Sequence, residues 1–280
     1  MPETTPATSN HSLKVIHPIH QCANVGIPFA HALKLAVASK GELEIVDFRG
    51  HDGEGLGVRA FLEKWGLLPH GAHSGDVQKI GIKVTKVVKH GNEKKELTKR
   101  MEKNNHDILV LGTKSQSHIL HFFGPDLVAY LAAHFRKATL YVPDAARPFV
   151  DPETGKTLLQ RILVPIAASP PSDRAFMYLH RLLKIFPGPA PLIIGLHCGN
   201  SFPSISAPFL KGLSWTQTLS SGSVATTILK NARKQNVDLI IMATKGRDTF
   251  TKKILGSITE QVVHSAPCPV LSVPARSYNK

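Results

Sequence analysis

Apolar residues along the chain fall into two alternating patterns. In short runs they occupy successive positions, which predicts strands buried on both faces. In the segments between, they recur every three or four positions, which predicts amphipathic helices. The clearest helical spacing lies in AFMYLHRLLKIF, where apolar residues from Phe176 to Phe186 share one face. This alternation predicts an α/β fold with parallel sheets covered by helices on both faces.

The same patterns give the expected elements of each half of the chain. In the first half we expect strands over 14–17, 43–48, 82–88, 108–111 and 139–142, and helices over 27–39, 58–65, 94–103 and 127–135. In the second half we expect strands over 161–165, 191–198, 213–219, 239–243 and 270–273, and helices over 175–186, 223–235 and 258–264. The Ser, Pro and Gly residues of 199–212 predict a loop.

Two pairs of segments show an internal repeat. LKVIHPIHQ resembles RILVPIAAS, and NNHDILVLGTKS resembles QNVDLIIMATKG. The halves therefore predict two domains of the same layout. We expect a disordered tail over 1–11, a first domain over 12–145, a linker over 146–160 and a second domain over 161–276.

Composition fits a packed protein in a reducing compartment. The 280 residues are 42% hydrophobic and 19% charged, and no apolar run is long enough to span a membrane. The polar start lacks the features of a secretion signal, and three widely spaced cysteines form no complete disulfide set. We therefore expect a cytoplasmic location. The net charge of +14 attracts anions, but no nucleic-acid recognition motif accompanies it.

The stretch ATKGRDTFTKKILGS, from Ala243 to Ser257, follows a predicted buried strand and leads into a predicted helix. Unpaired amides at a helix N-terminus favour phosphate, and the lysines and Arg247 add positive charge. Two glycines and a serine also flank many ordinary loops, so spacing alone leaves both interpretations open. By contrast, the Gly155-Lys156-Thr157 tripeptide has valine where a Walker A loop needs its first glycine.

The segment VDLIIMATKGRDTFTKKILGSITEQVVHSAPCPVLSV resembles the C-terminal signature of the universal stress protein family, and VPIAAS and the His-Cys pair resemble other parts of it in the family's order. The resemblance implies two tandem domains of flavodoxin-like, adenine nucleotide alpha hydrolase-like fold, each a five-stranded parallel sheet with helices on both faces. It also implies ATP, with its accompanying Mg²⁺, beyond the carboxyl ends of the strands. The residues that it assigns to this site in the second domain are Ile166, Ala167, Cys198, Met242, Ala243, Gly246, Arg247, Gly256, Ser257 and Ile258.

This sequence departs from the family pattern at two positions of that site. Ala167 stands where the family has a base-contacting Asp, and such a hydrogen bond is worth about 1.5 to 3 kcal/mol. Ala243 replaces the first glycine of the signature. The first domain departs further, because it has His20 at the Asp position and Pro125 in place of the hydroxyl. We therefore expect a weakened ATP site in the second domain and none in the first.

Other candidate chemistry is weaker. The histidine pairs His70/His73 and His118/His121 have no third ligand at a structural zinc spacing, so we assign no metal site. Cys268 has no partner that would mark a nucleophile, and no catalytic residue is assigned. Two functions remain open: a stress-response regulator with weak ATP binding, at most a slow ATPase, or a nucleotide-free interaction or scaffold protein.

The family resemblance also predicts how the domains associate. The last strands of the two domains, ATLYVP and PVLSV, should pair antiparallel within the chain and so cover two sheet edges. A homodimer of chains is compatible with the sequence, which does not decide it.

Overall fold

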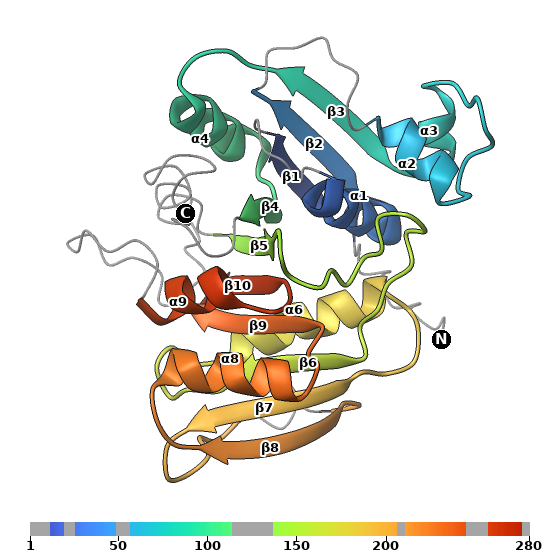
Figure 1. Ribbon diagram of the computed structural model, residues 1–280. Coiled ribbons are helices and arrows are strands. Elements are labelled where there is room, and N and C mark those ends of the chain that lie inside the picture. The colour runs from blue at the N-terminus through green and yellow to red at the C-terminus, as the bar shows by residue number, and fades with distance from the viewer. Residues whose placement is uncertain are drawn as a thin grey trace, which may run out of the picture.

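All described strands belong to one ten-stranded sheet with the order β3-β2-β1-β4-β5-β10-β9-β6-β7-β8 (Figure 1). The structure is a computed structural model that describes residues 12–19, 26–48, 57–113, 137–205, 211–244 and 257–275. Helices lie on both faces of the sheet, as the α/β pattern predicts. Each half contributes five strands in the equivalent order, so the predicted pair of domains with the same layout is confirmed.

The first half holds the strands and helices numbered up to β5. Its strands are β1 (Lys14–Ile19), β2 (Glu42–Asp47), β3 (Lys83–Val88), β4 (Ile108–Thr113) and β5 (Ala138–Pro143). Its described helices are α1 (Gly26–Ser39), α2 (Val58–Lys64), α3 (Asp76–Lys79) and α4 (Glu93–Asn104). The one-turn helix α3 was not expected, and the helix expected over 127–135 lies outside the described residues, as does the tail over 1–11.

The second half repeats this plan with a shorter middle. Its strands are β6 (Arg161–Pro165), β7 (Leu192–Cys198), β8 (Ser214–Ser220), β9 (Leu239–Thr244) and β10 (Val270–Pro274). Its described helices are α6 (Asp173–Ile185), α8 (Val224–Lys234) and α9 (Ser257–Ser265). Residues 199–205 and 211–212, the described parts of the expected loop, contain no helix. No helix in the described ranges is long and apolar enough to cross a membrane.

The two halves join through their last strands. β5 and β10 pair antiparallel, with Tyr141 opposite Val270 and Leu140 opposite Leu271, whereas the strand pairs within each half are parallel. This contact confirms the predicted intrachain pairing. Because the ladder is continuous across it, neither β5 nor β10 leaves an open edge.

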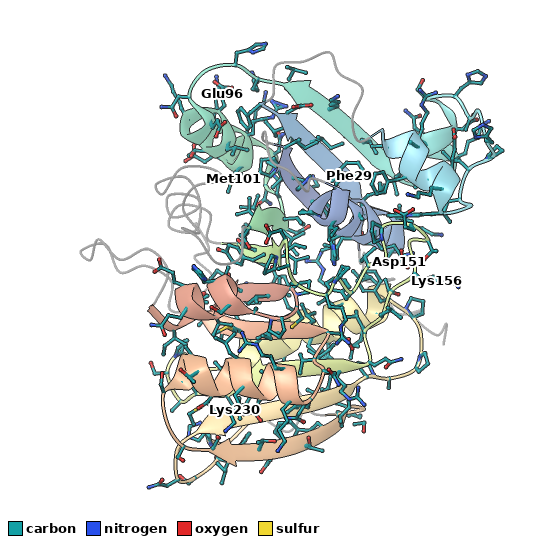
Figure 2. All side chains as sticks on the ribbon, viewed as in Figure 1. Phe29, Glu96, Met101, Asp151, Lys156 and Lys230 are labelled. Atoms are coloured by element: carbon teal, nitrogen blue, oxygen red, sulfur yellow. The ribbon has the colours of Figure 1, made fainter. Side chains whose placement is uncertain are left out.

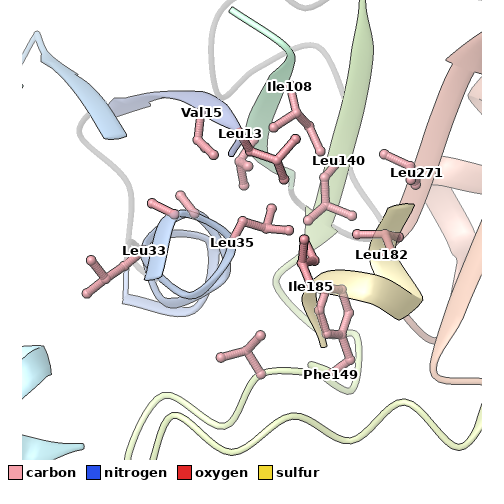
Figure 3. Close-up of a cluster of buried hydrophobic side chains, with 14 of the residues drawn as sticks. Leu13, Val15, Leu33, Leu35, Ile108, Leu140, Phe149, Leu182, Ile185 and Leu271 are labelled. Atoms are coloured by element: carbon pink, nitrogen blue, oxygen red, sulfur yellow. The ribbon is translucent and has the colours of Figure 1, made fainter. Parts of the chain in front are cut away.

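The core also runs across the junction. Figure 3 shows Leu35 of α1, Leu140 of β5 and Ile185 of α6 close to one another, with Phe149 of the connecting segment next to Ile185. In Figure 2 the side chain of Phe29 lies on the same helix α1, and Lys230 lies on α8 in the other half. One face of the sheet thus forms a single hydrophobic layer beneath α1 and α6.

An aspartate at the start of one strand in each half fixes a neighbouring strand and reaches the other half. The carboxylate of Asp238 accepts hydrogen bonds from the Arg161 amide at 2.9 Å and from the Arg147 guanidinium at 2.8 Å. Its repeat counterpart, Asp107, accepts from the Lys14 amide at 2.9 Å and from Arg181 at 3.4 Å. Arg181 of α6 therefore reaches across the junction to the first half, and Arg147 ties the connecting segment to the second half.

Candidate functional site

The candidate site lies where β6 and β9 separate. β6 pairs with β7 along its whole length, but its ladder with β9 ends after Leu163 and Ile240. The chain also reverses its direction of winding here, because β7 follows β6 on one side and β9 lies on the other. In open α/β sheets, ligands bind beyond the carboxyl ends of the strands at such a point.

Five of the ten predicted residues are described at this edge, and they lie on two faces of the sheet. Ile166 is buried in the core beneath α6, and Ala243 packs against that core. Met242 is buried in the core on the opposite face, and Cys198 at the end of β7 is half-buried. Ala167 follows β6 and is exposed.

His197 fixes the backbone that follows β6, a role that the sequence did not reveal. Its Nδ1 donates a hydrogen bond of 2.8 Å to the carbonyl oxygen of Ile166, and the Ile166 amide donates to Leu196 at 2.7 Å. The His197 ring also contacts Phe202, whose ring contacts Trp215. The position of Ala167 is thus tied to β7 through its neighbour Ile166. A histidine at the end of a buried strand was the only sequence signal for this contact.

The thiol of Cys198 is an uncharged part of the site. Burial raises its pKa, and a hydrogen bond with the Thr227 side chain offsets part of that effect. The thiol therefore stays protonated at neutral pH and presents a weakly polar wall rather than a nucleophile.

The predicted phosphate end of the site is described only at its last residues. Gly246, Arg247 and Gly256 lie outside the described residues. Ser257 is the first residue of α9, and the Ile258 side chain is 40% exposed. The structure therefore places the start of a helix after the glycine-rich stretch, as the pattern predicts.

The equivalent point of the first domain is closed by a histidine. The ladder between β1 and β4 also ends early, after Ile16 and Leu109. Beyond it, Nδ1 of His17 donates a hydrogen bond of 3.0 Å to the carbonyl oxygen of Val110. The His17 side chain is 2% exposed, and burial lowers its pKa to about 4 even though this hydrogen bond acts in the opposite direction. His20, the predicted counterpart of the missing Asp, lies outside the described residues.

Comparisons with known proteins agree with this architecture. The universal stress protein family matches residues 28–143 and 205–274. A universal stress protein from Methanothermobacter thermautotrophicus is 30% identical over 131 residues, which are 47% of this chain and 70% of that protein.

Solved structures also match the chain, at lower sequence identity. A universal stress protein from Archaeoglobus fulgidus has a TM-score of 0.63 and 18% identity, over 94% of this chain and 97% of that one. A universal stress protein family protein from Arabidopsis thaliana, solved with AMP bound, has a TM-score of 0.32 and 17% identity, over 42% of this chain and 93% of that one. From the two matched regions, the chain belongs to the universal stress protein family.

Proposed function

We propose that this chain is a stress-response regulatory protein whose second domain binds an adenine nucleotide, ATP, weakly. The observation that supports it most is the separation of β6 from β9 beyond Leu163 and Ile240. This leaves the residues that follow the two strands at one edge of the sheet, where this fold class holds its ligands. In the first domain the same point is bridged by His17.

The described residues fit an adenine held by apolar walls and by backbone groups. Ile166 is anchored by His197, and the Cys198 thiol is uncharged. Ala167 is exposed and offers no side-chain acceptor to the base. The loss of one charged hydrogen bond weakens binding by about tenfold to a hundredfold, so the proposed affinity is low.

The phosphates of the proposed ligand would be held by the segment after β9. Gly246 and Gly256 would let backbone amides approach them, Arg247 would supply charge, and Ser257 would donate a hydroxyl. Mg²⁺ would enter with ATP. We propose regulation rather than turnover as the use of the bound nucleotide.

A second candidate function is a nucleotide-free interaction or scaffold protein. The exposed methyl of Ala167 favours it, because a pocket released from ATP binding no longer needs the acceptor. The first domain supports the same idea, since a buried histidine already bridges its strands there.

Calorimetric titration of the purified protein with Mg²⁺-ATP separates the two functions. Weak binding supports the nucleotide site, whereas no heat up to millimolar ATP and no nucleotide released on denaturation support the scaffold. Ala167→Asp should tighten ATP binding about tenfold to a hundredfold. Gly246→Glu or Ser257→Ala should weaken it, and Ser115→Ala, at the corresponding loop of the first domain, should leave it unchanged.

A further inference from the structure

The two outer strands of the sheet hold equivalent places in the repeat. Lys14 of β1 pairs with Glu42 of β2, and Arg161 of β6 pairs with Leu192 of β7. Following these registers outward makes β3 equivalent to β8 residue by residue. At the centre of each edge strand, Lys86 corresponds to Gln217.

The edge strands differ in charge. β3 and the residue after it carry Lys83, Lys86 and Lys89, which lie within 4 Å of acidic side chains of β2 or α4. Lysines on an edge strand oppose pairing with another strand. The equivalent positions of β8 are Ser214, Gln217 and Ser220, and the strand SWTQTLS holds no charge. The β8 edge therefore lacks the protection that the β3 edge has.

The ladder shows which backbone groups of β8 face outward. The Gly199 amide donates to the carbonyl of Ser220 at 3.1 Å, so the even-numbered residues of β8 point their backbone groups toward β7. Because these groups alternate along a strand, those of Trp215, Gln217 and Leu219 point toward the open edge. Among the described strands, β8 pairs only with β7.

The sequence of β8 is nearly symmetrical about its central residue. Reading outward from Gln217, the strand has threonine on both sides, then Trp215 and Leu219, then serine on both sides. We propose that β8 pairs antiparallel with β8 of a second copy of this chain, about a two-fold axis at Gln217. The inference is independent of nucleotide binding.

This register satisfies both the backbone and the side chains of the edge. The residues whose backbone groups face outward meet one another, Gln217 with its own copy and Trp215 with Leu219, so each exchanges hydrogen bonds with its partner. The Leu219 side chain is 52% exposed in one chain and would cover the half-buried Trp215 of the other. Threonine would face threonine, which is a favourable cross-strand pair.

The near-symmetry of the uncharged strand SWTQTLS favours a second copy of this chain over a charged peptide as its occupant. Each chain carries +14, which opposes self-association, but salt screens charges more than about 8 Å apart, so the cost is lowest where two copies meet along an uncharged surface. The β8 edge provides one, and its two-fold symmetry gives the same contacts to both chains. One seven-residue strand per chain makes a small interface, so we expect a dissociation constant on the order of 10 to 100 μM at physiological salt.

Sedimentation equilibrium of the full chain tests the pairing at protein concentrations from about 5 to about 300 μM, which extend below and above the expected dissociation constant. The wild type should pass from monomer to dimer. Gln217→Pro removes an outward amide without breaking the β7 ladder, and Gln217→Lys introduces the residue of the other edge. Either change should raise the dissociation constant at least about tenfold, since it removes about 1.4 kcal/mol or more. Lys86→Pro, the matched change on β3, should leave association unchanged.

Amide hydrogen exchange gives a second readout that does not depend on a variant. Raising the protein concentration should slow exchange at Trp215, Gln217 and Leu219, and should leave the outward amides of β3 as they were. A wild type that stays monomeric throughout, or a dimer that survives Gln217→Pro with native circular dichroism, would overturn the proposal. Protection that appears on β3 instead would overturn it too.

Discussion

The two domains have the same strand order and the same early end to one ladder, but they differ in the residue that comes next. In the first domain this residue is His17, whose ring hydrogen-bonds the Val110 carbonyl across the gap. In the second domain the counterpart is Val164, which has no group that could do so. The shared fold therefore contains the same gap between two strands in each domain, and one side chain determines whether a hydrogen bond of the protein itself crosses that gap.

A second histidine, His31 of α1, is also buried in the first domain. Nδ1 of His31 donates to the Ile27 carbonyl at 2.8 Å, and its Nε2 accepts from the Val150 amide at 3.3 Å. Both nitrogens are used by the neutral ring. Burial lowers its pKa to about 4, with the backbone hydrogen bond to Ile27 acting against this shift and His17 adding to it. The first domain thus holds two histidines that must stay uncharged.

Lowering the pH should destabilise the first domain through these two histidines, and this is the largest effect that we expect. The folded pKa values of His17 and His31 lie below the unfolded value of 6.5, so the unfolded chain binds protons first as the pH falls. Their contribution is complete above pH 6.5 and is lost progressively down to about pH 4, by about 3 kcal/mol for each histidine. Urea unfolding at several pH values between 7 and about 4.5 measures this loss in the free energy of unfolding.

His17→Val, which copies the second domain, isolates one of the two histidines. The variant should lose less stability than the wild type over the same pH range. The carboxylate of Glu44 does not confuse this test. Burial acts to raise its pKa, but hydrogen bonds from His106, Asn104 and Arg100 outweigh it and lower the pKa to about 2, so its contribution is lost only below the range measured. Equal pH dependence in variant and wild type would contradict the expectation.

The two equivalent aspartates, Asp238 and Asp107, should differ in their contribution to the free energy of unfolding, by a smaller amount than the histidines contribute. Asp238 is 10% exposed and binds Arg147 and two backbone amides, whereas Asp107 is 32% exposed and binds Arg181 at a longer distance. Asp238→Ala should therefore cost about 3 kcal/mol and Asp107→Ala about 1 kcal/mol. Denaturant unfolding of the two variants at pH 7 checks this order, and equal losses would show that the repeat positions are energetically equivalent.

Much of the fold could be predicted from the sequence because its strands are buried on both faces. The repeat of NNHDILVLGTKS and QNVDLIIMATKG predicted the two equivalent domains, and the family resemblance predicted the antiparallel pairing of the last strands, which the structure shows with Tyr141 opposite Val270. Helix α3 was missed because one turn, Asp76–Lys79, is too short to show a helical period.

The site was less accessible to prediction because its contacts join distant parts of the chain. The hydrogen bond from His197 to Ile166 depends on the register of β6 with β7, and this register cannot be read from the sequence. The role of His17 depends on where the β1 and β4 ladder ends. A histidine inside an apolar strand was visible, but its partner was not.

A third contrast lies in the packing beside the candidate site. Gly195 and Trp215 of the second domain correspond to Ile45 and Val84 of the first, so a small and a large residue replace two of middle size. The Trp215 ring occupies the space of the missing side chain, because a Cβ added at Gly195 would lie 2.2 Å from its Cζ3 atom. The ring also contacts Phe176 of α6 and Phe202.

Gly195→Ile should therefore displace the indole ring and cost about 2 kcal/mol through overpacking. Denaturant unfolding measures the loss, and a red shift in tryptophan emission reports the exposure of Trp215. The double variant Gly195→Ile/Trp215→Val rebuilds the pair of the first domain, so it should recover part of the lost stability. A single variant as stable as the wild type would show that the Trp215 ring does not fill the space beside Gly195. A double variant less stable than the single one would show that the two packings are not interchangeable.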